Sequence, residues 1–120
     1  MPQLTQQQSS MLQTFQSHMS DKRYADAITL GQRLLGLGLP PTSEAHYIVL
    51  NNLGIAYELS GDQVNVYMEG GEVKFRSLDH LRRAVEVAQS MGRSDLAART
   101  SQLIQRLPNS YFETLFGSLD

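Results

Sequence analysis

Residues 50–62 read LNNLGIAYELSGD, the most informative stretch of this 120-residue chain for predicting the fold. Leu53, Ala56 and Tyr57 are spaced three and four residues apart, as on one face of an α-helix. Gly61 then interrupts the pattern, as glycine commonly does after the last turn of a helix. The stretch therefore predicts an amphipathic helix that ends near residue 60 and packs its apolar face on other helices.

Apolar residues recur at helical spacing on both sides of this helix. The segment from Gly36 to Pro41 holds two glycines and two prolines, which end the preceding helix, and Thr42 or Ser43 can cap the next one. Ser77 and Ser94 are the expected N-caps of two later helices. The expected helices cover about residues 8–19, 24–35, 43–60, 77–92, 94–107 and 110–119.

The period changes from helical to alternating between residues 64 and 76. β-Branched and aromatic residues alternate there with polar ones around Gly70-Gly71, a pair typical of a two-residue hairpin turn. With these glycines as the loop, one register places all the apolar residues on one face. That register pairs Met68 with Val73, Val66 with Phe75, Tyr67 with Lys74, Asn65 with Arg76, and Glu69 with Glu72.

A two-stranded hairpin is marginally stable in water, so its apolar face has to be covered. We expect this face to lie on the helices as a lid. Alternatively, an edge of the hairpin could add a strand to a partner or pair with a second copy in a homodimer. The hairpin surface offered to a partner would then be Tyr67, Lys74 and Arg76.

Composition limits the class of protein. The length suits one domain, and 41% apolar residues are enough for a core. The absence of cysteine excludes disulfides and cysteine-based metal sites, and a formal net charge of −2 gives no general attraction to nucleic acid or anionic membranes. The chain has neither a run of about 20 apolar residues nor a signal-peptide pattern at its start, so we expect a cytoplasmic protein.

The central stretch resembles the first helix and turn of a tetratricopeptide repeat, which carries a Leu-Gly-x-x-Tyr pattern followed by glycine. Leu53, Gly54 and Tyr57 match this pattern, and residues 50–57 are similar to the slightly longer repeats of kinesin light chain and of bacterial signalling ATPases. Small residues such as Ala27 and Gly54 would let paired helices approach closely. Further matches are Tyr24, Ala27 and Leu34 upstream, and Leu81, Val85, Ala88 and Gly92 downstream.

The resemblance implies an all-α superhelix of antiparallel helix pairs with about two repeats. Residues 8–39 would form the first repeat and residues 42–92 the second. The hairpin at 64–76 would be an insertion between the two helices of the second repeat, where the family has a short turn. Residues 94–120 lack the repeat pattern and would form capping helices, the last of them with an apolar stripe of Tyr111, Phe112, Leu115, Phe116 and Leu119.

In tetratricopeptide proteins the first helices of successive repeats line a groove that binds another protein. Asn52 lies where some members grip a terminal carboxylate, but Leu12 and Gln16 stand where the family's clamp has lysines, so we predict no carboxylate clamp. Carried over by position, the groove would be lined by Gln16, Met19, Ile48, Asn51, Asn52, Ile55 and Glu58, with Leu12 and Leu59 beside them.

Nothing in the sequence favours catalysis. His18, His46 and His80 do not have the spacing that places two metal ligands on one helical face, and no nucleophile, phosphate-binding or dinucleotide motif occurs. We therefore expect neither an enzyme nor a cofactor, but a non-enzymatic adaptor or assembly chaperone that binds a segment of a partner protein. The alternatives are a regulatory domain that senses a peptide or ligand, and a structural homo-oligomer that uses the hairpin or the C-terminal helix.

Overall fold

The structure, a computed structural model, describes residues 4–107 of the chain. It contains five long helices, one helical turn and one two-stranded antiparallel sheet within these residues. In chain order the elements are α1 (Gln6–Ser20), α2 (Tyr24–Gly36), α3 (Glu44–Leu59), α4 (Asp62–Asn65), β1 (Val66–Glu69), β2 (Glu72–Phe75), α5 (Arg76–Ser90) and α6 (Ser94–Gln105).

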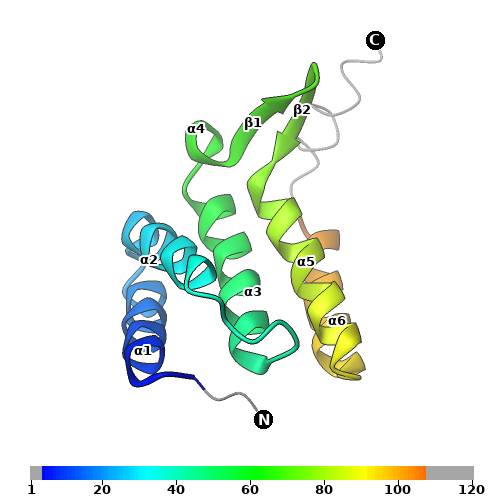
Figure 1. The fold of residues 1–120 in the computed structure, drawn as a ribbon. Coiled ribbons are helices and arrows are strands. Elements are labelled where there is room, and N and C mark those ends of the chain that lie inside the picture. The colour runs from blue at the N-terminus through cyan, green and yellow to red at the C-terminus, as the bar shows by residue number, and fades with distance from the viewer. Residues whose placement is uncertain (1–3, 108–120) are drawn as a thin grey trace.

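The long helices pack in chain order: α1 on α2, α2 on α3, α3 on α5, and α5 on α6. Figure 1 shows α3 in the middle of this row, with the hairpin extending beyond the end where α3 stops and α5 starts. The expectation of a mostly helical domain with one hairpin between two paired helices is confirmed.

Helix α3 occupies the centre because it is buried on two sides. Val49 and Leu53 belong to an apolar cluster with α1 and α2, whereas Tyr47 and Leu50 belong to another cluster with α5 and α6. The third cluster lies at the base of the hairpin and consists of Phe75, Leu78, Leu81 and Leu107. We refer to these as the first, second and third clusters.

At Gly54 the helices α3 and α5 approach each other closely. A Cβ atom added there would lie 2.5 Å from Cγ of Leu81 and 3.1 Å from the carbonyl oxygen of Ser77. Real side chains do not tolerate the first of these distances, so the two helices can pack this closely only because residue 54 lacks a side chain. The role predicted for this glycine agrees with the geometry.

The predicted hairpin register is correct over the four pairs from Val66–Phe75 to Glu69–Glu72. Gly70 and Gly71 have φ angles of 59° and 79°, which suit the glycine pair of a tight hairpin turn. The fifth pair that we predicted, Asn65 with Arg76, is wrong. Residues 62–65 form the short helix α4 instead, and the sheet is shorter than the predicted span of 64–76.

Asn65 bonds the first turn of α5 instead, and the predicted N-cap of that helix is wrong. Its side-chain oxygen accepts a hydrogen bond of 2.7 Å from the backbone N–H of Ser77, in the first turn of α5. The N-cap position itself is Phe75, and Ser77 lies inside the helix, so the serine that we expected to cap α5 does not do so. A fully buried asparagine from α4 thus ties the base of the hairpin to the helix that follows.

Three other predictions concern helix ends. Ser43 caps α3 through a hydrogen bond from His46 N–H, as predicted. Ser94 does not cap α6, because the N-cap position is Arg93. Helix α1 begins at Gln6, two residues before the predicted start, with Thr5 and Gln8 forming a reciprocal capping box. The helix expected over residues 110–119 lies outside the described residues.

Candidate functional site

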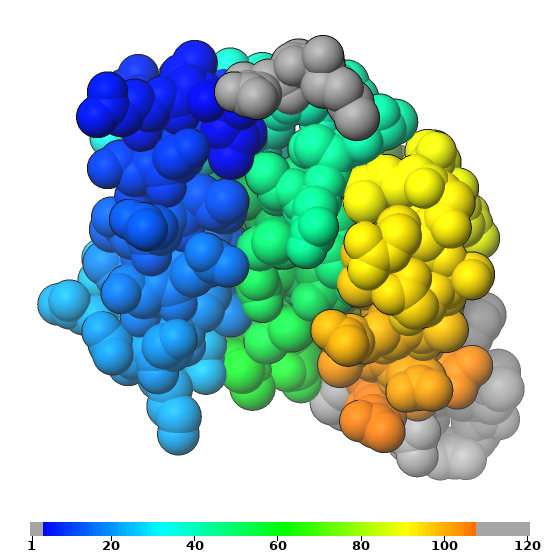
Figure 2. Space-filling view, turned by 90° about the horizontal axis from the view of Figure 1, so that it is seen from below, coloured from blue at the N-terminus to red at the C-terminus, as the bar shows by residue number. Residues whose placement is uncertain are grey.

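The exposed strip of α3 is the first candidate for a binding surface. Past its first turn, the residues of α3 that are not buried are Ile48, Asn51, Asn52, Ile55, Glu58 and Leu59. Figure 2 shows one face of the molecule, on which α3 (green) is visible between α1 (blue) and the yellow-to-orange residues that include α6. Because residues four, seven and eleven apart share a side of a helix, Ile48, Asn52, Ile55 and Leu59 form one continuous surface, which we call the α3 face.

The α3 face is apolar along its middle and has one free amide. Leu59 is 52% exposed, and Ile48 and Ile55 are partly buried. The Asn52 side chain forms no hydrogen bond with another residue in the described range 4–107. A partner backbone could therefore bond to this amide without displacing an internal contact.

A cavity of about 200 Å³ opens beside the α3 face, between α3, α5 and α6. Its lining is mainly apolar, with Ile55 and Leu103 among the contributors. Glu58 and Arg106 supply opposite charges to the same lining. Two of the predicted site residues, Ile55 and Glu58, thus line one pocket, and no pattern in the sequence indicated that α6 would complete it.

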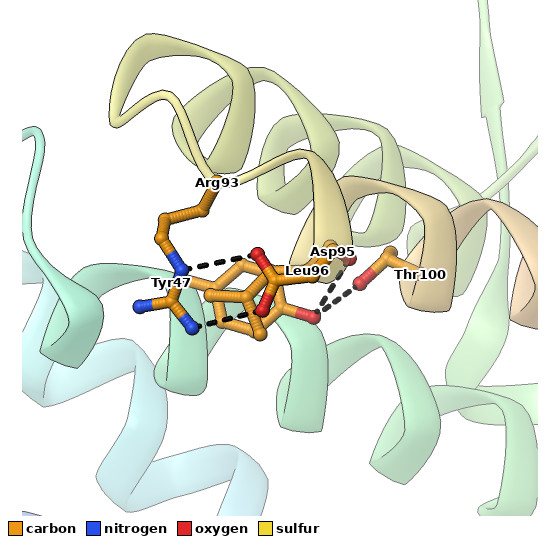
Figure 3. A network of polar contacts seen from close by, with 5 residues as sticks. All are labelled: Tyr47, Arg93, Asp95, Leu96 and Thr100. Atoms are coloured by element: carbon orange, nitrogen blue, oxygen red, sulfur yellow. Dashed lines mark hydrogen bonds and ion pairs between the residues drawn. The ribbon is translucent and has the colours of Figure 1, made fainter.

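Asn51 was predicted to bind a partner, but its side-chain oxygen is used inside the protein. It accepts a hydrogen bond of 2.7 Å from Thr100 Oγ1 on α6. Thr100 Oγ1 also lies 2.6 Å from the hydroxyl of Tyr47, and that hydroxyl donates to the carbonyl oxygen of Leu96 at 3.2 Å. Figure 3 shows Tyr47 reaching from α3 to both groups on α6. We therefore assign Asn51 to the packing of α6 on α3.

An exposed ion pair lies next to this network in Figure 3. The Arg93 guanidinium donates two hydrogen bonds of 3.0 Å to the carboxylate of Asp95, at the start of α6. These bonds lower the pKa of Asp95 to about 2 and raise the pKa of Arg93. Both side chains are solvated, so the pair contributes little to stability.

The two predicted site residues on α1 lie on another helix than the α3 face. Gln16 is exposed, and Met19 packs partly against the first cluster. Leu12, predicted beside them, packs against the same cluster. Of the three, Gln16 is the exposed residue, whereas Leu12 and Met19 are partly buried.

The polar residues of the hairpin are bonded to the protein itself. The Tyr67 hydroxyl donates a hydrogen bond to Asp79 Oδ2 on α5, which is the main reason why the pKa of Tyr67 is raised to about 12. The Arg76 guanidinium lies 4.6 Å from the centre of the Tyr67 ring, and Lys74 Nζ lies 3.4 Å from Glu69 Oε1. The two contacts of Tyr67 hold the polar side of the hairpin on α5, and the Lys74–Glu69 pair joins the two strands, whereas Met68 on the other side is 63% exposed.

The sequence offered no signal for a second polar network, which joins α2, α3 and α5. Gln32 Nε2 lies 2.9 Å from the Tyr57 hydroxyl and 3.0 Å from His80 Nε2. His80 Nδ1 lies 2.7 Å from the carbonyl oxygen of Arg76 and must carry a hydrogen, so Nε2 accepts from Gln32 and the ring is neutral. Burial lowers the pKa of His80, which also favours this neutral form.

Within residues 4–107, no group of three or more His, Asp or Glu side chains is arranged to hold a metal ion. None of the helices in this part of the chain combines the length and the apolar character needed to cross a bilayer. The chain matches no known protein-family model, no curated protein and no solved structure. What the protein binds is therefore inferred from its own surface.

Proposed function

We propose that the protein is a non-enzymatic adaptor or assembly chaperone that binds an extended or helical segment of another protein along the α3 face. The observation that supports this most is the combination of exposed or half-buried Ile48, Ile55 and Leu59 with the amide of Asn52, which no other residue of the described part of the chain bonds. Apolar side chains supply binding energy through burial, and an amide fixes the position of a bound backbone.

The cavity beside the α3 face adds a place for a side chain of the partner. At about 200 Å³ it exceeds the roughly 150 Å³ that accommodates a benzene ring, so one aromatic or branched side chain would fit. A surface formed by packed helices needs little ordering on binding, so a few such contacts suffice for affinities around the micromolar range.

The helical packing is compatible with the proposed tetratricopeptide-like architecture. In that arrangement α1 and α3 would be the first helices of the two repeats and α6 a capping helix, and all three helices are visible on the face in Figure 2. The repeat pattern of residues 50–61 and the close approach at Gly54 support the same proposal.

A peptide selected from a random display library provides a defined probe for this function. Its affinity would be measured by calorimetry on the unmodified protein and on the double variant Asn52→Ala/Ile55→Asp. We expect the double variant to bind at least about tenfold more weakly, because a charge replaces an apolar contact and an amide is lost.

The matched control is Gln102→Ala/Ala98→Asp, which makes the same kinds of change on the exposed outer side of α6. Its affinity should equal that of the unmodified protein. Equal affinity of both double variants would contradict the proposed site. Sedimentation of the free protein tests the homo-oligomer alternative, because a dimer that dissociates on Met68→Asp would place the interaction at the hairpin instead.

A further inference from the structure

Two side chains of opposite charge, Glu58 and Arg106, line the cavity beside the α3 face. Glu58 is partly buried in the last turn of α3, and Arg106 is exposed at the C-cap of α6. Neither side chain forms a hydrogen bond or an ion pair with another residue of the described range 4–107, and they do not bond each other. The cavity therefore combines a mainly apolar lining with one unpaired carboxylate and one unpaired guanidinium.

Glu58 lies at an end of α3 where a cation is favoured. The last carbonyl groups of a helix carry partial negative charge, which attracts cations and disfavours anions. The last turn of α3 contains no basic residue, and Glu58 adds a full negative charge to it. A positive group beside Glu58 would therefore be stabilised by the carboxylate and by the helix end together.

Covering the cavity removes water from Glu58. An occupant with only apolar groups would leave the partly buried carboxylate unpaired, and this cost offsets the gain from burying an apolar side chain. An occupant that brings a cation avoids the cost, and the attraction is stronger beside the apolar walls of Ile55 and Leu103 than in bulk water. The Arg106 guanidinium offers paired donors to a carboxylate in the same way.

The cavity and the α3 face share Ile55, so a segment that lies along the face passes the cavity. We propose that this partner segment places an apolar side chain in the cavity, with a basic residue on one side that bonds Glu58 and an acidic residue on the other that bonds Arg106. This specificity presupposes the proposed function, binding along the α3 face, and adds the chemistry of the partner. Because the two charges stand on different helices, they also fix the direction in which the segment lies.

Two selections from one random peptide library test the charge pattern. The targets are the unmodified protein and the charge-swapped variant Glu58→Arg/Arg106→Glu. Peptides selected on the unmodified protein should carry an apolar residue with a basic residue on one side and an acidic residue on the other, adjacent in sequence or one helical turn away. The charge-swapped variant should select the reverse order, because each end of the cavity then attracts the opposite charge.

The matched control is Glu86→Arg/Arg99→Glu, which swaps two exposed charges of α5 and α6 outside the cavity lining. Peptides selected on this variant should keep the charge order of those selected on the unmodified protein.

The milder variant Glu58→Gln tests the same contact without introducing a new charge. We expect it to bind a peptide selected on the unmodified protein about tenfold more weakly. Replacing the basic residue of that peptide by glutamine should also weaken binding to the unmodified protein about tenfold. The same replacement should weaken binding to Glu58→Gln by less than about twofold, because the contact is already lost.

Two results would overturn the proposal. The first is a set of peptides that lose affinity for Asn52→Ala/Ile55→Asp but show no reversed charge order on the charge-swapped variant; the α3 face would then bind partners without this specificity, and the proposed function would stand. The second is the recovery of no peptide, or only of peptides whose affinity is unchanged in Asn52→Ala/Ile55→Asp, which would contradict the proposed function and the charge pattern together.

Discussion

The two buried tyrosines of α3, Tyr47 and Tyr57, anchor the central helix in chemically different ways. Tyr47 reaches toward α6 and bonds to a hydroxyl and a carbonyl, groups that do not titrate near neutral pH. Tyr57 bonds through Gln32 to His80, whose ring is neutral where Gln32 Nε2 donates to it. Both networks join helices that are distant in sequence, but we expect only the Tyr57 network to respond to mild acid.

Because of this difference, we expect one of the two helix contacts to depend on pH and the other to be independent of it. The α3–α6 contact is held by hydroxyl and amide groups, which do not titrate over a wide pH range. We therefore expect the cavity beside the α3 face to keep its shape over that range. The α2–α3–α5 contact depends on a histidine, so in mild acid we expect α2 to loosen from α3 and α5 before α6 loosens from α3. Four predictions follow from this comparison, ordered by the size of the expected effect.

The largest effect is expected at Gly54, where the close packing of α3 and α5 leaves no room for a side chain. Gly54→Ala would place a Cβ 2.5 Å from Leu81 Cγ. We expect a net loss of about 2 kcal/mol in the free energy of unfolding in urea, since overpacking outweighs the better helix propensity of alanine. Gly36→Ala is the matched control, because no atom lies within 4 Å of its added Cβ. If both variants unfold at the same urea concentration, the close approach is not what stabilises the pair.

Removing the hydroxyl of Thr100 tests the network that does not titrate. Thr100→Val leaves Asn51 Oδ1 without its donor and Tyr47 with one partner fewer. We expect a loss of about 1.5 kcal/mol that is the same at pH 7.5 and pH 5.5. Thr29→Val, on an exposed part of α2, should change stability by less than about 0.5 kcal/mol. A loss at Thr100 that grows on acidification would contradict the distinction between the two networks.

Acidification tests the histidine network directly. Burial places the pKa of His80 in the folded protein below its ordinary value of 6.5, and the nearby Arg83 and Arg76 act in the same direction, against Asp79 and the backbone hydrogen bond to Arg76. The unfolded chain therefore takes up the proton first. The contribution of His80 to stability is complete above pH 6.5 and is lost as the pH falls below it, by at most about 1.4 kcal/mol per pH unit.

The variant His80→Gln separates this effect from other titrations. Gln32 and Tyr57 come from α2 and α3 and carry no charge at these pH values, so the charged neighbours of His80 are those on α5. We expect the stability lost between pH 7.5 and pH 5.5 to be smaller in His80→Gln than in the unmodified protein by about 1 kcal/mol. An equal loss in both proteins would show that His80 is not the sensitive group.

The smallest effect is expected for the exposed ion pair beside Tyr47. The pKa of Asp95, measured by NMR titration, should lie near 2 and return toward its ordinary value of 3.8 in Arg93→Gln. Because both side chains are solvated, Asp95→Asn should leave the unfolding transition unchanged at neutral pH. A clear destabilisation would mean that the pair, and not the Tyr47 network, positions the start of α6.

The parts of the fold that follow from short-range pattern could be predicted from sequence. The helix ending near residue 60 and four pairs of the hairpin depend on neighbours within a few positions. The predicted N-caps at Ser77 and Ser94 are wrong for the same reason. A serine before an apolar stripe caps a helix only if the helix starts after that serine, and both helices start at or before it. At Ser77 the hairpin leads directly into α5, and Asn65, twelve residues earlier, satisfies the backbone.

The residues of the candidate site were harder to predict from sequence, because whether a side chain is free or bonded depends on residues far away in the chain. Asn51 and Asn52 are adjacent and chemically identical, yet Asn51 is bonded to Thr100, 49 residues away, whereas the Asn52 side chain has no hydrogen-bond partner among residues 4–107. His80 likewise has its hydrogen-bond partner in Gln32, 48 residues away. No local pattern distinguishes a bonded amide or a buried histidine from an exposed one.

The most direct test of the proposed function is to map a bound peptide on the methyl groups of the protein by NMR. With the selected peptide at saturation, the account predicts shifts of the Ile48, Ile55, Leu59 and Leu103 methyl signals, with the Met68 signal unchanged. Shifts confined to Met68 and the hairpin, with the α3 face unaffected, would contradict it.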